Sequence, residues 1–315
     1  MKEKPDYISE IRRMKAEKNA IILAHYYQTG DIQDIADFVG DSLALSQKAA
    51  SNNADIILFA GVRFMAETAK ILAPEKKILL PDINAGCSLA DSCKAKDFKK
   101  FIKDNPGRTI VSYVNTTAEI KALSDIICTS SNAISIVNSL PPEEKIIFAP
   151  DRNLGNYVLN KTGRDIIVWN GTCHVHEEFS LEAILKLKEQ NTDAKIIVHP
   201  ECELPVRMVA DYIGSTAALL KFTKEDNGNC YIIATEPGII HQMKKENPYK
   251  TYIPAPPRDS TCGCSECNFM KLITVEKIYN CLKNEKPEIK LNEKLITAAQ
   301  KPIKRMLEIS GKTGN

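Results

Sequence analysis

Three cysteines in the segment DSTCGCSECNFMK form the densest group of reactive side chains in the sequence. They are Cys262, Cys264 and Cys267. Their C-x-C-x-x-C spacing suits a zinc turn, a thiol–disulfide switch, or one part of a metal centre assembled from distant segments. Two further cysteines with polar neighbours, Cys87 in PDINAGCSLADSC and Cys173 in WNGTCHVHEEF, favour the third interpretation.

The cysteine spacing is close to regular along the chain. Cys87 and Cys173 are 86 residues apart, and Cys267 follows 94 residues later. One thiolate from each of three similar units would make a trigonal set of sulfurs. Zinc would complete this set with a fourth ligand or a water, whereas a 4Fe-4S cluster would keep one iron open as a Lewis acid. Spacing alone leaves both metals open, and His174 and His176 are candidate ligands or ligand partners.

The elements that must position these residues repeat three times. β-Branched runs at residues 19–28, 108–117 and 194–203 each end in polar side chains. His25, Tyr113 and His199 in these runs follow one another at intervals of 88 and 86 residues. A second strand is expected after each run, and it opens with an aspartate. We identify these aspartates as Asp55, Asp125 and Asp211.

Further strands alternate with helices in each unit, which predicts right-handed βαβ crossovers and parallel sheets covered on both faces. We therefore expect an α/β fold of three αβα domains with small parallel sheets, related by pseudo-threefold symmetry. The expected domains are residues 1–105 with an N-terminal helix, 106–192, and 193–315 with C-terminal helices. The last of these C-terminal helices is expected to be interrupted or kinked near Pro302.

Ligands bind beyond the carboxyl ends of parallel strands, so the active site is expected at the central interface of the three units. The side chains expected to converge there are His25, Tyr27, Tyr113, Asn115, His199 and Glu201.

Hydroxyl groups at expected helix starts indicate an anion site. Ser130 and Ser131 precede one helix, and Ser215 and Thr216 precede another at the corresponding place in the next unit. A helix N-terminus with a capping hydroxyl can bind phosphate or a dicarboxylate, although plain capping explains each pair equally well. In the first unit Ser42 is the candidate for this position.

Composition narrows the class of protein. The 42 basic and 40 acidic residues give a net charge of +2, which predicts neither a nucleic-acid partner nor a membrane partner. No apolar run has the length of a membrane span, so we expect a cytoplasmic protein. In a reducing compartment a disulfide framework is not expected. Simple burial is predicted for Cys93, Cys128, Cys202, Cys230 and Cys281.

The chain resembles the quinolinate synthase family, the A protein of de novo NAD biosynthesis, over nearly its whole length. The segments that carry the resemblance include LAHYYQ, GDSLALS, FAGVRFMAETAKIL, PDINAGCSLADSC, YVNTTAEIKA, FAPDRNLG, WNGTCHVHEEF, HPEC, GSTAALL and CNFMK. The resemblance implies three αβα domains and a 4Fe-4S cluster with three cysteine ligands and one open iron. The reaction it implies is condensation of iminoaspartate (iminosuccinate) with dihydroxyacetone phosphate to quinolinate, with release of phosphate and two waters.

The resemblance also implies a ligand set. Cys87, Cys173 and Cys267 match the cluster ligands of the family, which leaves Cys262 and Cys264 spare. A disulfide between Cys264 and Cys267 would remove a ligand, and this redox switch is a hypothesis.

Roles for individual residues follow from the resemblance together with the repeat. Glu201 is expected to be the principal base, with Tyr27, Tyr113, His25 and His199 orienting substrate or relaying protons. Residues expected around the dicarboxylate or phosphate are His25, Ser42, Tyr113, Val114, Asn115, Ser130, His199, Pro200, Glu201, Ser215 and Thr216. The expected supplier of iminoaspartate is L-aspartate oxidase or aspartate dehydrogenase.

Three other classes compete with this interpretation. They are an iron–sulfur hydro-lyase acting on another small acid, a zinc-stabilised binding protein without turnover, and a thiol redox sensor. Product analysis separates the first, and the colour of anaerobically purified protein separates the second. The third leaves the histidine, glutamate and hydroxyl residues without a role.

Overall fold

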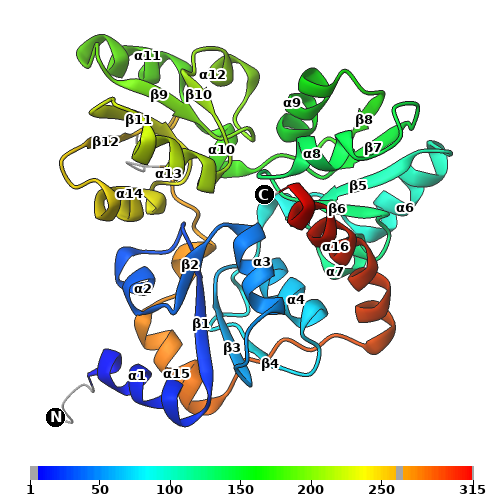
Figure 1. The fold of residues 1–315 in the computed structure, drawn as a ribbon, viewed down its shortest axis with the longest axis vertical. Coiled ribbons are helices and arrows are strands. Elements are labelled where there is room, and N and C mark those ends of the chain that lie inside the picture. The colour runs from blue at the N-terminus through cyan, green and yellow to red at the C-terminus, as the bar shows by residue number, and fades with distance from the viewer. Residues whose placement is uncertain (1–5, 260–264, 314–315) are drawn as a thin grey trace.

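Three four-stranded parallel sheets are grouped around a common centre in the computed structural model, which describes residues 6–259 and 265–313 (Figure 1). This confirms the predicted α/β fold with three small parallel sheets. The first sheet contains β1 (Ala20–His25), β2 (Phe38–Gly40), β3 (Ile56–Ala60) and β4 (Lys77–Leu79). The second contains β5 (Thr109–Tyr113), β6 (Ile126–Cys128), β7 (Ile146–Ala149) and β8 (Ile166–Val168). The third contains β9 (Lys195–Val198), β10 (Tyr212–Ile213), β11 (Cys230–Ala234) and β12 (Thr251–Pro254).

All three sheets have the same topology. The strand orders are β2-β1-β3-β4, β6-β5-β7-β8 and β10-β9-β11-β12, and every neighbouring pair is parallel. The first strand of each unit therefore lies between the second and the third strand of the same unit. The strands of each sheet all fall within one of the three expected ranges, and the exact domain boundaries stay a prediction.

The assignment of Asp55 as the repeated aspartate is wrong. In the second and third units, Asp125 and Asp211 accept a hydrogen bond from the backbone N–H of Ile110 and Ile196, respectively, in the first strand. In the first unit Asp37 makes this contact, with Ile22 at 2.7 Å. The short strand β2 follows Asp37 and corresponds to β6 and β10, whereas Asp55 precedes the longer apolar strand β3, which corresponds to β7 and β11. The topology thus places Ser42, directly after β2, at the position that the hydroxyl pairs occupy in the other units.

Helices cover both faces of the sheets, as buried parallel strands require. The strands β3 and β7 are buried at every position. The helices of the first unit are α1 (Tyr7–Glu17), α2 (Gly30–Ile35), α3 (Ser42–Ala50), α4 (Arg63–Leu72) and α5 (Ser88–Asp91). Helix α6 (Ala95–Asp104) packs on the second sheet, and the other helices of that unit are α7 (Ala118–Lys121), α8 (Ala133–Asn138), α9 (Arg152–Thr162) and α10 (His174–Glu177). Helix α11 (Leu181–Gln190) packs on the third sheet, with α12 (Leu204–Met208), α13 (Thr216–Glu225), η1 (Pro237–Ile239), α14 (Ile240–Glu246) and η2 (Met270–Leu272) in the same unit.

The two C-terminal helices leave the third sheet and pack on the other two units (Figure 1). Helix α15 (Val275–Asn284) lies against α1, and α16 (Glu293–Thr313) lies against α4, α7 and β6. Buried residues of α16 join one apolar core with the first and second sheets. Helix α16 continues through Pro302, so the expected interruption of the helix at this residue is wrong.

None of the described helices is both long enough and apolar enough to cross a membrane.

Candidate active site

A cavity lies where the carboxyl ends of the three sheets meet. His25 ends β1, Tyr113 ends β5, and His199 follows β9, so corresponding strands deliver one side chain each. The expected site residues that line this cavity are His25, Tyr27, Ser42, Cys87, Tyr113, Asn115, Ser130, Cys173, His199, Glu201, Thr216 and Cys267. The predicted convergence of the three units on one cavity is confirmed.

Three expected substrate-binding residues are not among those that line the cavity. Val114 is 1% exposed and packs in the core. Pro200 is also buried. The Ser215 hydroxyl accepts a hydrogen bond from Ala218 N–H and caps α13. The structure therefore brings Thr216 to the cavity and gives its neighbour Ser215 a capping contact.

The three predicted ligand cysteines line the cavity as free thiols. Cys87 directly precedes α5, Cys173 directly precedes α10, and Cys267 lies just before η2, so each sulfur sits at the start of a helical turn. Burial raises the pKa of Cys87 to about 12 and that of Cys267 to about 11, and it raises the pKa of Cys173 well above its usual range. Metal binding at these sulfurs must therefore displace protons.

Backbone N–H groups act against the effect of burial at all three sulfurs. The residues three positions further on, Ala90, His176 and Met270, each lower the pKa of the cysteine that precedes them. A sulfur that faces the N–H groups of a helical turn is favoured as a thiolate, which is the form that binds metals. The same local arrangement thus recurs once in each third of the chain.

One of the three thiols belongs to a compact group of possible metal ligands. Among residues 6–259 and 265–313, the one group of three ligand side chains whose donor atoms all lie within 4.8 Å of one another is Cys173, His176 and Glu201. Cys87 and Cys267 are outside this group, but they line the same cavity as Cys173.

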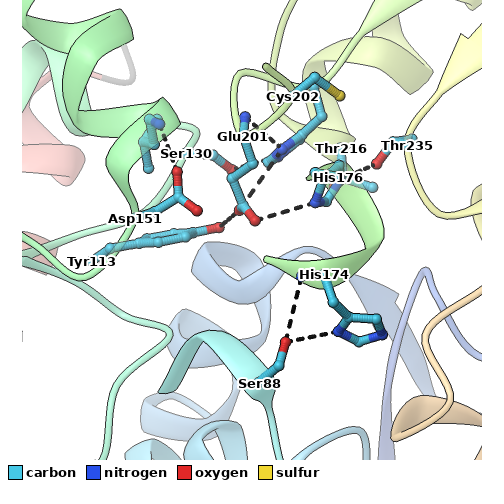
Figure 2. A network of polar contacts seen from close by, with 12 residues as sticks. Ser88, Tyr113, Ser130, Asp151, His174, His176, Glu201, Cys202, Thr216 and Thr235 are labelled. Carbon is cyan, nitrogen blue, oxygen red and sulfur yellow. Dashed lines mark hydrogen bonds and ion pairs between the residues drawn. The ribbon is translucent and has the colours of Figure 1, made fainter. Parts of the chain in front are cut away.

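Glu201 is held between residues of the second unit. It is 2% exposed, and its Oε1 accepts a hydrogen bond of 2.5 Å from the Tyr113 hydroxyl (Figure 2). Its Oε2 lies 3.2 Å from Nδ1 of His176. Burial would raise the pKa of Glu201, but His176 and the Tyr113 hydrogen bond outweigh this effect and lower it. The carboxylate is therefore ionised and fixed in orientation.

A chain of hydrogen bonds continues from His176 to Tyr27. His176 Nε2 lies 2.9 Å from Thr235 Oγ1, and Thr235 Oγ1 lies 2.8 Å from the Tyr27 hydroxyl. Tyr27 also contacts Thr216 Oγ1 at 2.9 Å. Figure 2 shows the part of this network that runs from Tyr113 through Glu201 and His176 to Thr235. Tyr27 extends it to the first unit, so the network connects residues from all three units.

The histidines at the ends of β1 and β9 are neutral and share one tautomer. Burial lowers the pKa of His25 and of His199 to about 3. Nδ1 of His25 accepts a hydrogen bond from the backbone N–H of Tyr27, and Nδ1 of His199 accepts one from the backbone N–H of Glu201. A neutral imidazole that accepts at Nδ1 carries its proton on Nε2. The His199 Nε2–H thus donates to Ser130, at 3.2 Å.

Sequence reasoning missed two residues of this region. Thr235 follows β11 and takes part in the polar network, and Asp151 follows β7, where it caps α9. Asp151 is 0% exposed, and burial raises its pKa well above the usual range. Both residues lie at the carboxyl ends of strands, so applying the strand-end rule to the third strand of each unit would have found them.

The remaining cysteine predictions are mostly confirmed. Cys93, Cys128, Cys202 and Cys281 are buried, whereas Cys230, the first residue of β11, is partly exposed. Cys262 and Cys264 lie outside the described residues, so the proposed disulfide switch stays a hypothesis.

A buried cavity shared by three parallel sheets, with an ionised carboxylate, neutral histidines and three thiols, defines an α/β enzyme whose active centre all three units build. The family profile described as Quinolinate synthetase A protein matches residues 9–308, and the chain belongs to this family. It is similar to quinolinate synthases from Thermosynechococcus vestitus (58% identity), Rippkaea orientalis (59%) and Synechocystis sp. (57%). Each match covers 97% of this chain and 94–96% of the relative. The chain is thus an enzyme of the quinolinate synthase type, which serves NAD biosynthesis.

Proposed function

We propose that the enzyme condenses iminoaspartate with dihydroxyacetone phosphate to give quinolinate, phosphate and two waters. The observation that supports this most directly is the cavity itself, which combines a fixed carboxylate, neutral histidine donors and three thiols from different units. Ring formation from these substrates needs proton transfers at carbon, loss of phosphate and loss of water, without net oxidation or reduction.

Binding of the dianionic substrates is assigned to polar atoms that face the cavity. Asn115 Oδ1 is buried and has no hydrogen-bond partner among residues 6–259 and 265–313, so a substrate donor would satisfy it. Thr216 opens α13, where backbone N–H groups favour a carboxylate or phosphate. Ser42 opens α3 at the equivalent place, and Ser130 and the Nε2–H of His25 complete the polar lining.

Glu201 is assigned as the principal base. It is ionised, and Tyr113 fixes it through Oε1, so the carboxylate need not reorient to accept a proton. The hydroxyl groups of Tyr27 and Tyr113 are both protonated, since burial raises their pKa well above the usual range. They can therefore donate hydrogen bonds to oxygen atoms on which negative charge develops.

Cys87, Cys173 and Cys267 would hold the cofactor, a 4Fe-4S cluster. Their position around one cavity and the backbone N–H groups at each sulfur support this assignment. When bound, a cluster with one iron free of protein ligands supplies a Lewis acid that stabilises negative charge on a departing oxygen. Apolar side chains such as Val62, Phe64 and Phe269 line the same cavity and limit the access of water.

A cytoplasmic location fits a reducing environment for these thiols, and iminoaspartate supply by L-aspartate oxidase or aspartate dehydrogenase belongs to the same proposal.

Anaerobic iron and sulfide analysis combined with a quinolinate assay tests the proposal. We expect about four irons and four sulfides per chain, and quinolinate with phosphate as products, as a 4Fe-4S cofactor requires. Cluster-loaded protein that forms a different product would refute the substrate assignment, and active protein without iron would refute the cofactor.

A further inference from the structure

We propose that the cluster-free chain has a second metal specificity, in which Cys173, His176 and Glu201 bind one divalent transition-metal ion, best matched by zinc. The donor atoms of these three residues all lie within 4.8 Å of one another. The site shares Glu201 and Cys173 with the proposed catalytic centre, and its competition with the cluster rests on the proposed role of Cys173.

Two buried donor atoms face each other in this site. His176 and Glu201 are each 2% exposed, and the residues that the structure describes give Nδ1 of His176 and Oε2 of Glu201 no hydrogen bond, only their ion-pair contact with each other. An ion between them would bind both atoms at once. The two atoms are 3.2 Å apart, close to the separation of about 3.4 Å between nitrogen and oxygen ligands of a tetrahedral zinc ion.

The other polar atom of each side chain already has a partner. His176 Nε2 lies 2.9 Å from Thr235 Oγ1, and Glu201 Oε1 accepts a hydrogen bond of 2.5 Å from Tyr113 (Figure 2). A histidine that binds metal through one ring nitrogen usually donates the other N–H to an acceptor, which fixes the ring. Thr235 and Tyr113 thus orient both ligands before an ion arrives.

Charge and donor type favour zinc. A thiolate and a carboxylate together carry two negative charges, which a divalent ion neutralises inside a buried site. Sulfur and nitrogen donors disfavour Mg²⁺ and Ca²⁺, which prefer oxygen. The site supplies three protein ligands, and the cavity leaves room for water as the fourth. Zinc would thereby occupy one cluster ligand and the assigned base at once, so a zinc-loaded chain would resist cluster assembly.

The alternative is an ion held by Cys87, Cys173 and Cys267, and cobalt spectroscopy separates the two sites. The full chain, stripped of its cluster, is titrated anaerobically with Co²⁺ and then with Zn²⁺ as competitor. We expect one ion per chain and a charge-transfer band with the intensity of one thiolate. Cys87→Ser and Cys267→Ser should keep the band, whereas Cys173→Ser and His176→Gln should lose it.

Loss of the band in Cys87→Ser or Cys267→Ser, or a full band in His176→Gln, overturns the proposal. Because a change at buried His176 can impair folding, Thr235→Val and Thr235→Ser provide a second test. Thr235→Val removes the hydroxyl at similar volume and should weaken Co²⁺ binding about 10- to 100-fold, whereas Thr235→Ser should restore it. Equal affinities for the two variants would also overturn the proposal.

Cluster assembly is measured separately on the same preparations. Reconstitution with iron and sulfide should fail after Zn²⁺ is added and succeed without it. Failure in both cases would refute the proposed cluster and leave the cobalt result standing, so the two proposals fail in distinguishable ways.

Discussion

Tyr113, at the end of β5 in the second sheet, donates a hydrogen bond of 2.5 Å to Glu201, which follows β9 in the third sheet. Both side chains are almost fully buried, so the contact is protected from water. A carboxylate held this way has one oxygen fixed, and its charge is maintained by a donor from another part of the chain. The position of the assigned base thus depends on how two units pack together.

Glu201→Gln should abolish proton abstraction without disturbing metal binding by the three cysteines. A general base contributes about 10²- to 10⁴-fold, so we expect kcat to fall by that factor at unchanged iron content. Tyr113→Phe should lower kcat about 10- to 100-fold, since it removes one hydrogen bond to a charged group. Steady-state kinetics on anaerobic protein measures both. A Glu201→Gln enzyme with wild-type turnover would show that another residue is the base.

Cys87→Ser should lose iron and sulfide while the protein stays folded. A serine hydroxyl is a far weaker ligand for iron–sulfur clusters than a thiolate. The matched control is Cys281→Ala, because Cys281 is buried in α15 away from the cavity and should be dispensable for the cofactor. Iron content and the brown colour report the result. Full iron content in Cys87→Ser would remove this residue from the ligand set.

The variants Cys264→Ser and Cys267→Ser show which cysteine of the segment 262–267 is a cluster ligand and which is spare. Cys267 lines the cavity and Cys264 is spare in the proposed ligand set, so Cys267→Ser should lose the cluster and Cys264→Ser should keep it. If oxidation forms a disulfide between them, mild oxidant should release iron from the wild type faster than from Cys264→Ser. The opposite ranking of iron contents would reverse the ligand assignment.

Lys121→Met should weaken substrate binding more than turnover. The Lys121 side chain is fully buried, and its ammonium donates to the carbonyls of Val114 and Thr116, on either side of Asn115. Without these bonds the loop that carries Asn115 loses its orientation, and KM should rise about tenfold, equivalent to about 1.4 kcal/mol. Lys99→Met, at an exposed position of α6, is the control. A lower kcat at constant KM would contradict a positioning role.

Glu285 makes stability depend on pH at the junction of α1, β4 and α15. Hydrogen bonds from Lys18 and Lys77 lower the pKa of Glu285 from its usual 4.5 to about 2. Because the folded pKa is the lower one, this stabilisation is complete above about pH 4.5 and is lost as the pH falls toward 2.

Glu285→Gln should therefore reduce the free energy of unfolding by about 0.5–1 kcal/mol at pH 7 and by progressively less below pH 4.5. Urea unfolding at several pH values measures this difference. Glu189→Gln, on the exposed side of α11, should change little at any pH. A Glu285→Gln deficit that stays constant down to pH 3 would mean that the charge of Glu285 is not its cause.

The repeat, the strand ends and the three cysteines that line the cavity were readable from the sequence. Buried parallel strands appear as β-branched runs, and the residues that end them must meet at one edge, so the places of His25, Tyr113 and His199 follow from local pattern alone. The strand β2 escaped because the longer apolar run of β3 follows Asp55 directly, and Asp55 was taken for Asp37 as a result.

The contacts that define the chemistry were not readable in this way. Glu201 meets Tyr113 and His176, and Thr235 meets Tyr27, across units that no periodic signal relates to one another. The packing of α15 and α16 on the first two units is likewise a long-range choice. By itself the sequence determined the three sheets and the residues at their edges, because hydrophobic periodicity acts locally. Only tertiary structure decided which of those residues touch, because side-chain contacts between units depend on how their surfaces pack.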